Sequence, residues 1–144
     1  MTPRVRELRI VYAPVNDAGP LFQVGRPADA AALLRDRLEQ ESVEVCLVLV
    51  LDTRHRVRGV HQVGRGTLDS CLVHPRDVFK AAVLANAAAV IVAHNHPSGD
   101  PTPSPDDVAL CERLRHAAAI LGIGLLDFVV IGDGTYYSFQ EQGR

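Results

Sequence analysis

Two short, uninterrupted apolar runs, Val45–Leu51 and Ala87–Ala93, constrain the fold of this chain more than any other feature. A helix that spans a bilayer needs about 20 consecutive apolar residues, so neither run can be a membrane helix. A strand with one wet face alternates apolar and polar residues, whereas these runs are apolar on both faces. They are therefore expected to be buried strands of a sheet that is covered on two sides.

The other elements are predicted from helical spacing and from turn residues. Helices are expected at Ala28–Gln40, at Pro75–Asn86 and from the cap Ser104 to Leu121. Strands are expected at Val5–Tyr12, Val43–Leu51, Val57–Val63, Ser70–Val73, Ala88–Ala93, Leu125–Ile131 and Thr135–Phe139. The stretch His94–Asp107, rich in proline and glycine, is expected to be a rigid loop. This alternation predicts an α/β domain in which helices flank a central mixed β-sheet.

The length and the cysteines indicate what kind of domain this is. A short N-terminal arm, residues 1–20, is expected to precede one domain at residues 21–144. A chain of this length buries roughly 68 to 70% of its unfolded surface, so it needs no disulfide or structural metal to stay folded. Cys46, Cys71 and Cys111 form no C-x-x-C, which argues against a disulfide framework and a thiolate zinc cage. Because arginines also interrupt the N-terminal segment where a secretory signal would be apolar, a cytoplasmic location is expected.

The charge balance bears on possible partners. The chain has 15 Lys and Arg residues against 17 Asp and Glu residues, a formal net charge of −2. A broad phosphate-binding surface would give a basic excess. A nucleic-acid partner is therefore not supported by charge, and no membrane partner is expected.

His94 and His96 are the first sign of metal chemistry. They lie two residues apart in an extended segment, so both imidazoles can project to the same side and share one ion. A catalytic zinc commonly has three protein ligands, and two His with one carboxylate is among the known sets. The other histidines are expected to be ordinary surface or core residues: His55, His61, His74 and His116.

The carboxylate ligand has three local candidates, Asp100, Asp106 and Asp107. The positions four, seven, eleven and fourteen after Asp107 are all apolar, so Asp107 is expected to face the core. The position seven after Asp106 is Arg113, which indicates that Asp106 faces outward. Asp107 is therefore the predicted third ligand.

Ser104 and Glu44 each have two interpretations. Ser104 followed by Pro105 is a good helix start, and a hydroxyl that accepts an amide proton there can still donate elsewhere. Glu44 lies on an otherwise apolar strand, where an unpaired carboxylate is costly to bury. It is either a strand-end acid in water or the base that takes a proton from a metal-bound water.

These residues together resemble a known signature. HNHP at residues 94–97, six further residues and SPDD at 104–107 fit the H-x-H-P-x6-S-x-x-D pattern of the JAMM (MPN-plus) zinc metalloproteases. Glu44, 50 residues before His94, suits the separate glutamate of that family. The segments HNHPSG, GTL at 66–68, VHPRDVFKAA at 73–82 and VVIGDGTYYSF near the C-terminus are similar to the RadC branch. The resemblance covers roughly residue 25 to the C-terminus.

The resemblance implies a fold and a role for each residue of the signature. The fold would be a cytidine-deaminase-like (JAB/MPN) α/β sandwich with a mixed sheet. Zn2+ would be held by His94, His96 and Asp107. Glu44 would be the general acid/base, and Ser104 would help to stabilise the tetrahedral oxyanion.

Three departures from the RadC branch accompany the resemblance. The helix-hairpin-helix domain that often precedes this domain in RadC relatives is not expected in this chain. Phe128 stands where the branch usually has His, and Cys111 replaces a usual Thr. The five signature residues are intact. These departures therefore concern the substrate and the fine adjustment of the site by surrounding residues more than metal binding.

The leading functional hypothesis is a zinc metallopeptidase or isopeptidase of the JAMM type. Its partner would be a protein or peptide substrate, such as one with a ubiquitin-like tail. The alternative is a RadC-type module that is associated with DNA repair or binds metal without catalysis. Nucleobase deamination would need H-x-E and P-C-x-x-C, and the sequence has neither.

Overall fold

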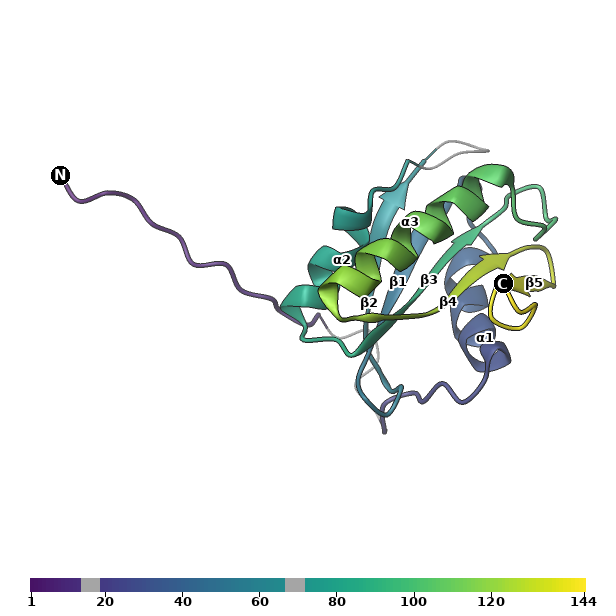
Figure 1. The fold of residues 1–144 in the computed structure, drawn as a ribbon, viewed down its shortest axis with the longest axis horizontal. Coiled ribbons are helices and arrows are strands. Elements are labelled where there is room, and N and C mark those ends of the chain that lie inside the picture. Colours follow the sequence, from purple (N-terminus) through teal and green to yellow (C-terminus); the bar gives the residue numbers. More distant parts are fainter. Residues whose placement is uncertain (14–18, 67–71) are drawn as a thin grey trace.

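The computed structural model describes residues 1–13, 19–66 and 72–144, and these residues form a five-stranded mixed sheet with three helices (Figure 1). The strands are β1 (Val45–Leu51), β2 (Val57–Arg65), β3 (Ala89–Asn95), β4 (Gly124–Ile131) and β5 (Tyr136–Ser138). The helices are α1 (Pro27–Leu38), α2 (Pro75–Leu84) and α3 (Pro105–Leu121). The predicted α/β architecture with a central mixed sheet is confirmed.

The strand order, β2-β1-β3-β4-β5, decides which strand ends meet. β3 and β4 are parallel, whereas β1 is antiparallel to both of its neighbours, and β5 is antiparallel to β4. Parallel neighbours need a crossover connection, which α3 provides between β3 and β4. The start of β1 and the carboxyl ends of β3 and β4 therefore lie at the same edge of the sheet.

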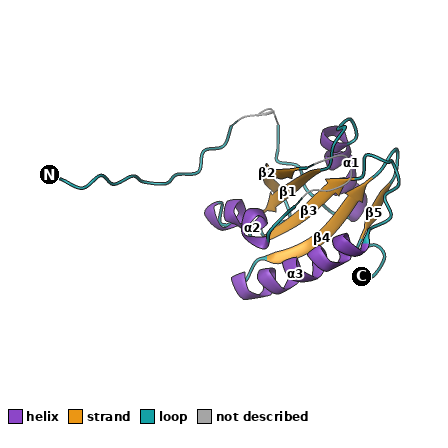
Figure 2. Ribbon diagram, turned by 90° about the horizontal axis from the view of Figure 1, so that it is seen from above, coloured by secondary structure: helices purple, strands orange, loops and turns teal. Residues whose placement is uncertain are grey.

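Helices cover both faces of the sheet, as the apolar runs predict. Every residue of β1 and β3 is buried. Alternate residues face the layer of α2 and α3: Cys46, Val48, Val90 and Val92. The residues between them face α1: Val45, Leu47, Leu49, Leu51, Ala89, Ile91 and Ala93. Figure 2 shows α1 on one side of the sheet and α2 with α3 on the other.

Proline starts each helix, and the ends differ slightly from the predicted ones. Pro27, Pro75 and Pro105 occupy first-turn positions, where the missing N–H would have no helical partner. α1 and α2 each end two residues before the predicted residue. In α2 the reason is Asn86, whose φ of 54° cannot continue a helix. α3 ends as predicted, with Gly122 in the left-handed conformation.

The predicted strand Val5–Tyr12 is wrong. Residues 1–13 contain neither helix nor strand, they are exposed, and they project away from the domain (purple in Figure 1). A segment with the composition of a strand forms a stable strand only beside other strands that pair with its backbone. The pattern alone does not show whether such a neighbour exists.

Two other predicted segments need correction. Leu72 and Val73 do not form a strand, and the rest of the segment Ser70–Val73 lies outside the described residues, as does Cys71. The predicted loop from His94 begins two residues later, because β3 continues to Asn95 and pairs there with β4. None of the helices in the described ranges has the length and hydropathy that crossing a membrane requires.

Candidate metal centre

The sheet edge where β1 begins and β3 ends carries the candidate site. Cys46 of β1 is the register partner of His94 of β3. Glu44 immediately precedes β1 and is two residues before Cys46, so it projects to the same face as His94. α3 begins over that face, and its first turn supplies Asp107. Segments 50 residues apart in sequence thus meet at one point.

Four side chains form a tight cluster there: Glu44, His94, His96 and Asp107. One potential ligand atom from each lies within 4.8 Å of all the others. Asp107 joins the two imidazoles, with Oδ1 at 2.8 Å from Nε2 of His94 and Oδ2 at 3.0 Å from Nε2 of His96. Glu44 Oε1 lies 2.7 Å from Nδ1 of His94. Two imidazoles and two carboxylates are a donor set that can hold a metal ion.

Two buried atoms of the cluster lack a hydrogen bond among the described residues, Nε2 of His94 and Oε2 of Glu44. Nε2 is close to Asp107, but the contact does not have hydrogen-bond direction. An unsatisfied buried polar group costs free energy, and most such groups in proteins have a partner or mark a functional site. A metal ion at the cluster would provide a partner for such atoms. The two histidines and two carboxylates therefore fit a bound metal ion.

The ring of His96 is oriented by the loop that follows β3. Its Nδ1 lies 2.8 Å from the carbonyl oxygen of Asp100 and donates to it. This hydrogen bond fixes the tautomer and turns Nε2 toward Asp107, as a partner of a metal-binding histidine does. Asp100, one of the three candidate carboxylates, thus contributes its backbone, while its carboxylate accepts from Thr102.

Ser104 and Asp107 form a reciprocal cap at the start of α3. Ser104 Oγ accepts from the backbone N–H of Asp107 at 3.1 Å, and the backbone N–H of Ser104 donates to Asp107 Oδ2 at 2.8 Å. Asp107 is buried and Asp106 is exposed, which is the orientation that helix phase predicts. The cap therefore aims the Asp107 carboxylate at the two histidines.

The electrostatics of the cluster favour a cation between the imidazoles and the carboxylates. Burial by itself lowers the pKa of His94, but the adjacent Asp107 and Glu44 outweigh it and raise that pKa to about 9. The contact with Asp107 raises the pKa of His96 despite burial. Burial raises the pKa of Asp107, yet the two histidines hold it well below its usual range. A metal ion would compete with protons for these nitrogen and oxygen atoms, because imidazole and carboxylate ligands bind a metal in their deprotonated forms.

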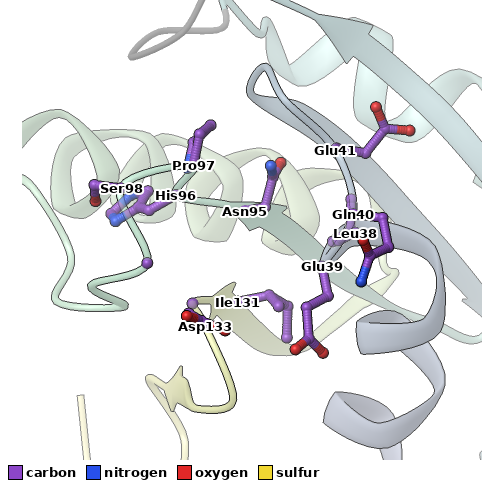
Figure 3. A pocket seen from close by; sticks show the side chains of 12 residues that line it. Leu38, Glu39, Gln40, Glu41, Asn95, His96, Pro97, Ser98, Ile131 and Asp133 are labelled. Atoms are coloured by element: carbon purple, nitrogen blue, oxygen red, sulfur yellow. The ribbon is translucent and has the colours of Figure 1, made fainter.

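A cavity of about 320 Å³ opens beside His96, on the side of the sheet that α1 covers (Figure 3). It lies between the end of α1, the loop after β3 and the turn after β4. Among the residues that the structure describes, three carboxylates line it and no Lys or Arg side chain does: Glu39, Glu41 and Asp133. Ion pairs join Glu39 to Arg35 and Glu41 to Arg65.

Sequence reasoning brought forward all four residues of the cluster but overlooked Asn95. Its side chain is buried and hydrogen-bonds to the backbone on both sides of Glu44. No short-range pattern signals such contacts, since the partners are 50 and 52 residues away. Phe128, the departure from the RadC pattern, packs its ring edge-on against His94 with centroids 5.6 Å apart.

Comparison with known proteins identifies the family of this chain. Residues 24–144 match the family model described as the RadC-like JAB domain. A UPF0758 protein of Clostridium perfringens is 42% identical over 120 residues, which is 83% of this chain and 53% of that protein. A UPF0758 protein of Pelobacter propionicus is 53% identical over 100 residues, 69% of this chain and 44% of that protein. The chain spans about half the length of the curated relatives it matches.

Proposed function

Because this chain belongs to the RadC-like JAB domain family, we propose that it is a zinc-dependent metallopeptidase or isopeptidase of the JAMM type. The reaction would be hydrolysis of a peptide or isopeptide bond. The observation that carries the proposal is the cluster of Glu44, His94, His96 and Asp107, with its ligand atoms within 4.8 Å of one another.

The types of ligand support zinc as the metal. Two imidazoles and one carboxylate, from His94, His96 and Asp107, form a set known from catalytic zinc sites, which keep one position open. When bound there, zinc would polarise a substrate carbonyl and acidify a water molecule. Two of these ligands are held in place by hydrogen bonds: His96 donates to the carbonyl of Asp100, and Asp107 accepts from the backbone N–H of Ser104.

Glu44 is the proposed general acid/base. One of its oxygens contacts Nδ1 of His94, while Oε2 is buried without a hydrogen bond among the described residues. A carboxylate oxygen held in this way can take a proton from the attacking water and pass it to the leaving amine. General acid–base catalysis of this kind contributes roughly 10²- to 10⁴-fold to a rate.

Ser104 is the proposed oxyanion donor. Its Oγ accepts the amide proton of Asp107, and this leaves the hydroxyl hydrogen for donation, since a hydroxyl has one donor and two acceptor sites. A donor directed at the developing oxyanion stabilises the transition state more than the ground state.

The cavity beside His96 supports a peptide as the substrate. Its volume of about 320 Å³ is large enough for one or two side chains, and it borders the metal cluster through His96. Two of the three lining carboxylates, Glu39 and Glu41, are already paired with arginines, so among the described residues it is Asp133 that favours a basic group over an acidic one. A protein with a flexible tail, such as a ubiquitin-like protein, would be able to place one or two side chains of that tail in the cavity.

The test is Glu44→Gln in the zinc-loaded protein, assayed on a panel of peptide and isopeptide substrates. We expect a full complement of zinc, because the three proposed ligands His94, His96 and Asp107 remain, and a fall in turnover of roughly 10² to 10⁴. Glu112→Gln, an exposed glutamate of α3, is the matched control and should retain turnover.

The possible contrary results are distinct. Loss of zinc from Glu44→Gln would make Glu44 a ligand, and unchanged turnover would remove it from the mechanism. A parent protein that holds zinc but cleaves no member of the panel would contradict the peptidase and favour a non-catalytic metal-binding module.

A further inference from the structure

Asn95 stands between the two histidines of the cluster but faces the other way. Along β3 successive side chains alternate, so His94 points toward α3 and Asn95 toward the α1 side. Figure 3 shows the Asn95 side chain directed toward the chain that links α1 to β1. It is 3% exposed, although asparagine is usually a surface residue.

Both polar atoms of Asn95 are used, and both contact the neighbours of Glu44. Oδ1 accepts from the backbone N–H of Val45 at 2.7 Å, and Nδ2 donates to the carbonyl of Val43 at 3.0 Å. The residue between those two partners is Glu44. The Asn95 side chain thus hydrogen-bonds to the backbone of the residue before Glu44 and of the residue after it.

The sheet alone does not hold Glu44 beside His94. The register of β1 with β3 runs only as far as the pair Cys46 and His94. β3 pairs with β4 as far as Asn95 and Ile131, and the N–H of His96 continues that pairing by donating to the carbonyl of Ile131. The Asn95 side chain provides the hydrogen bonds to β1 that the backbone of β3 no longer makes.

A second anchor comes from the opposite side. The carbonyl of Glu44 accepts from the backbone N–H of Gly66 at 2.8 Å, just after β2. The backbone around Glu44 is therefore held on the β2 side by the N–H of Gly66 and by the pairing of Val45 with Arg65, and on the β3 side by two hydrogen bonds of the Asn95 side chain. These restraints leave the carboxylate directed at Nδ1 of His94, 2.7 Å away.

We propose that Asn95 is a positioning residue, which holds the general acid/base Glu44 against His94 of the metal cluster. An effect of Asn95 on turnover rests on the proposed function. Its effect on the position of Glu44 does not. A residue that only stabilised the sheet would affect unfolding but leave Glu44 in place.

The geometric test follows the Nδ1 proton of His94 by histidine-selective NMR in the metal-free chain of 144 residues. The carboxylate of Glu44 protects this proton, and Glu44→Ala defines the spectrum without that contact. We expect Asn95→Ala to show the same loss of the protected proton and faster amide exchange at Val45. Asn95→Leu, close in size and without polar atoms, gives the same test if the alanine variant does not fold.

Ile91→Val is the matched control, because Ile91 lies on the same face of β3 as Asn95. The change weakens packing but leaves the hydrogen bonds of Asn95 to Val43 and Val45 in place. It should lower the melting temperature and keep the protected proton. A protected His94 proton in both Asn95→Ala and Asn95→Leu would overturn the proposal.

The catalytic test uses the zinc-loaded protein and a substrate from the panel. Asn95→Leu should lower kcat by up to about a hundredfold with KM and zinc content unchanged, since a small misplacement of a catalytic group is that costly. The loss should vanish when Glu44 is already Gln. An equal loss in the Glu44→Gln background would overturn the proposal, while a parent without activity would contradict only the proposed function.

Discussion

At the scale of single residues, Asp107 combines two roles that are often treated as alternatives. Its Oδ2 accepts from the backbone N–H of Ser104, as a residue in a capping box does, and the same oxygen faces His96. The cap fixes the carboxylate in the orientation that metal binding needs. Helix start and metal ligand are therefore one structure, and the sequence pattern that signals the first also signals the second.

The ligand assignment predicts the metal content of a histidine variant. The protein should purify with about one zinc per chain, and His96→Ala should lose most of it, because two ligands bind zinc far more weakly than three. Elemental analysis after gel filtration measures the ratio. His116→Ala changes an exposed histidine of α3 and should keep the zinc. Equal zinc in His96→Ala and the parent would show the assignment to be wrong.

Capping and oxyanion stabilisation by Ser104 are separated by Ser104→Gly. Glycine caps a helix within a few tenths of a kcal/mol of serine, so the melting temperature should stay close to that of the parent. Loss of an oxyanion donor lowers turnover by roughly a hundredfold to a thousandfold. Zinc content, melting and turnover are measured on the same sample. Unchanged turnover would leave Ser104 with the cap alone.

At the scale of elements, the loop after β3 depends on the turn after β4. A Cβ atom placed on Gly132 would lie 2.4 Å from the carbonyl oxygen of Gly99 and 2.9 Å from Pro101 Cδ. The N–H of Asp133 donates to the same carbonyl at 2.8 Å. This loop also carries Asp100, whose carbonyl orients the His96 ring, so the contact between loop and turn reaches the metal cluster.

Gly132→Ala should therefore destabilise the protein and weaken zinc binding together. The extra methyl cannot fit without moving the backbone of the loop, and overpacking of this kind costs about 1 to 3 kcal/mol. Thermal melting and a competition titration with a zinc chelator measure the two effects. Gly124→Ala, whose added Cβ would meet ordinary contacts at 3.6 Å or more, is the control. Tight zinc binding in Gly132→Ala would argue against this link.

The sequence predicted well those elements that carry their own signals. The buried strands β1 and β3 were evident from apolar runs, and α3 from its cap, its phase and its terminal Gly122. Helical phase also identified the inward face of Asp107 before its contacts were known. Each of these signals is local, because propensity, capping and periodicity act within a few residues.

What the sequence did not predict depends on distant partners. Val5–Tyr12 was predicted to be a strand, yet no strand lies beside it among the described residues. Asn95 looks like a spacer between two ligands until its hydrogen bonds to Val43 and Val45 are seen. The contact of Glu44 with His94 likewise requires the register of β1 against β3. Tertiary pairing, which the local pattern does not encode, decided all three cases.

At the scale of the whole molecule, the site lies where the two apolar layers end. Phe128, in the layer of α2 and α3, packs against His94, while Leu38 and Ile131, in the layer of α1, line the cavity. The cluster itself is held by both sides of the sheet. Filling the site with a metal should therefore stabilise the entire fold and not one loop.

Removal of the metal should lower the melting temperature measurably. A ligand present at 100 times its Kd stabilises the folded state by about 2.7 kcal/mol. For a chain of this length that corresponds to roughly 5 to 10 °C. Calorimetry with zinc and with a chelator measures the shift, which His96→Ala should not show. A parent that melts at the same temperature in both conditions would contradict a metal site within the fold.

The distances along the chain within the cluster also suggest an order of assembly during folding. Asp107 follows His96 by 11 residues, whereas Glu44 and His94 are 50 residues apart. Closing the longer loop costs about 1.3 kcal/mol more chain entropy, since the cost grows as the logarithm of loop length. The segment from β3 to the start of α3 can thus gather the two imidazoles and Asp107 early, by local collapse. Glu44 joins only when the antiparallel pairing of β1 with β3 is complete, so the proposed proton acceptor is the last part of the site to form.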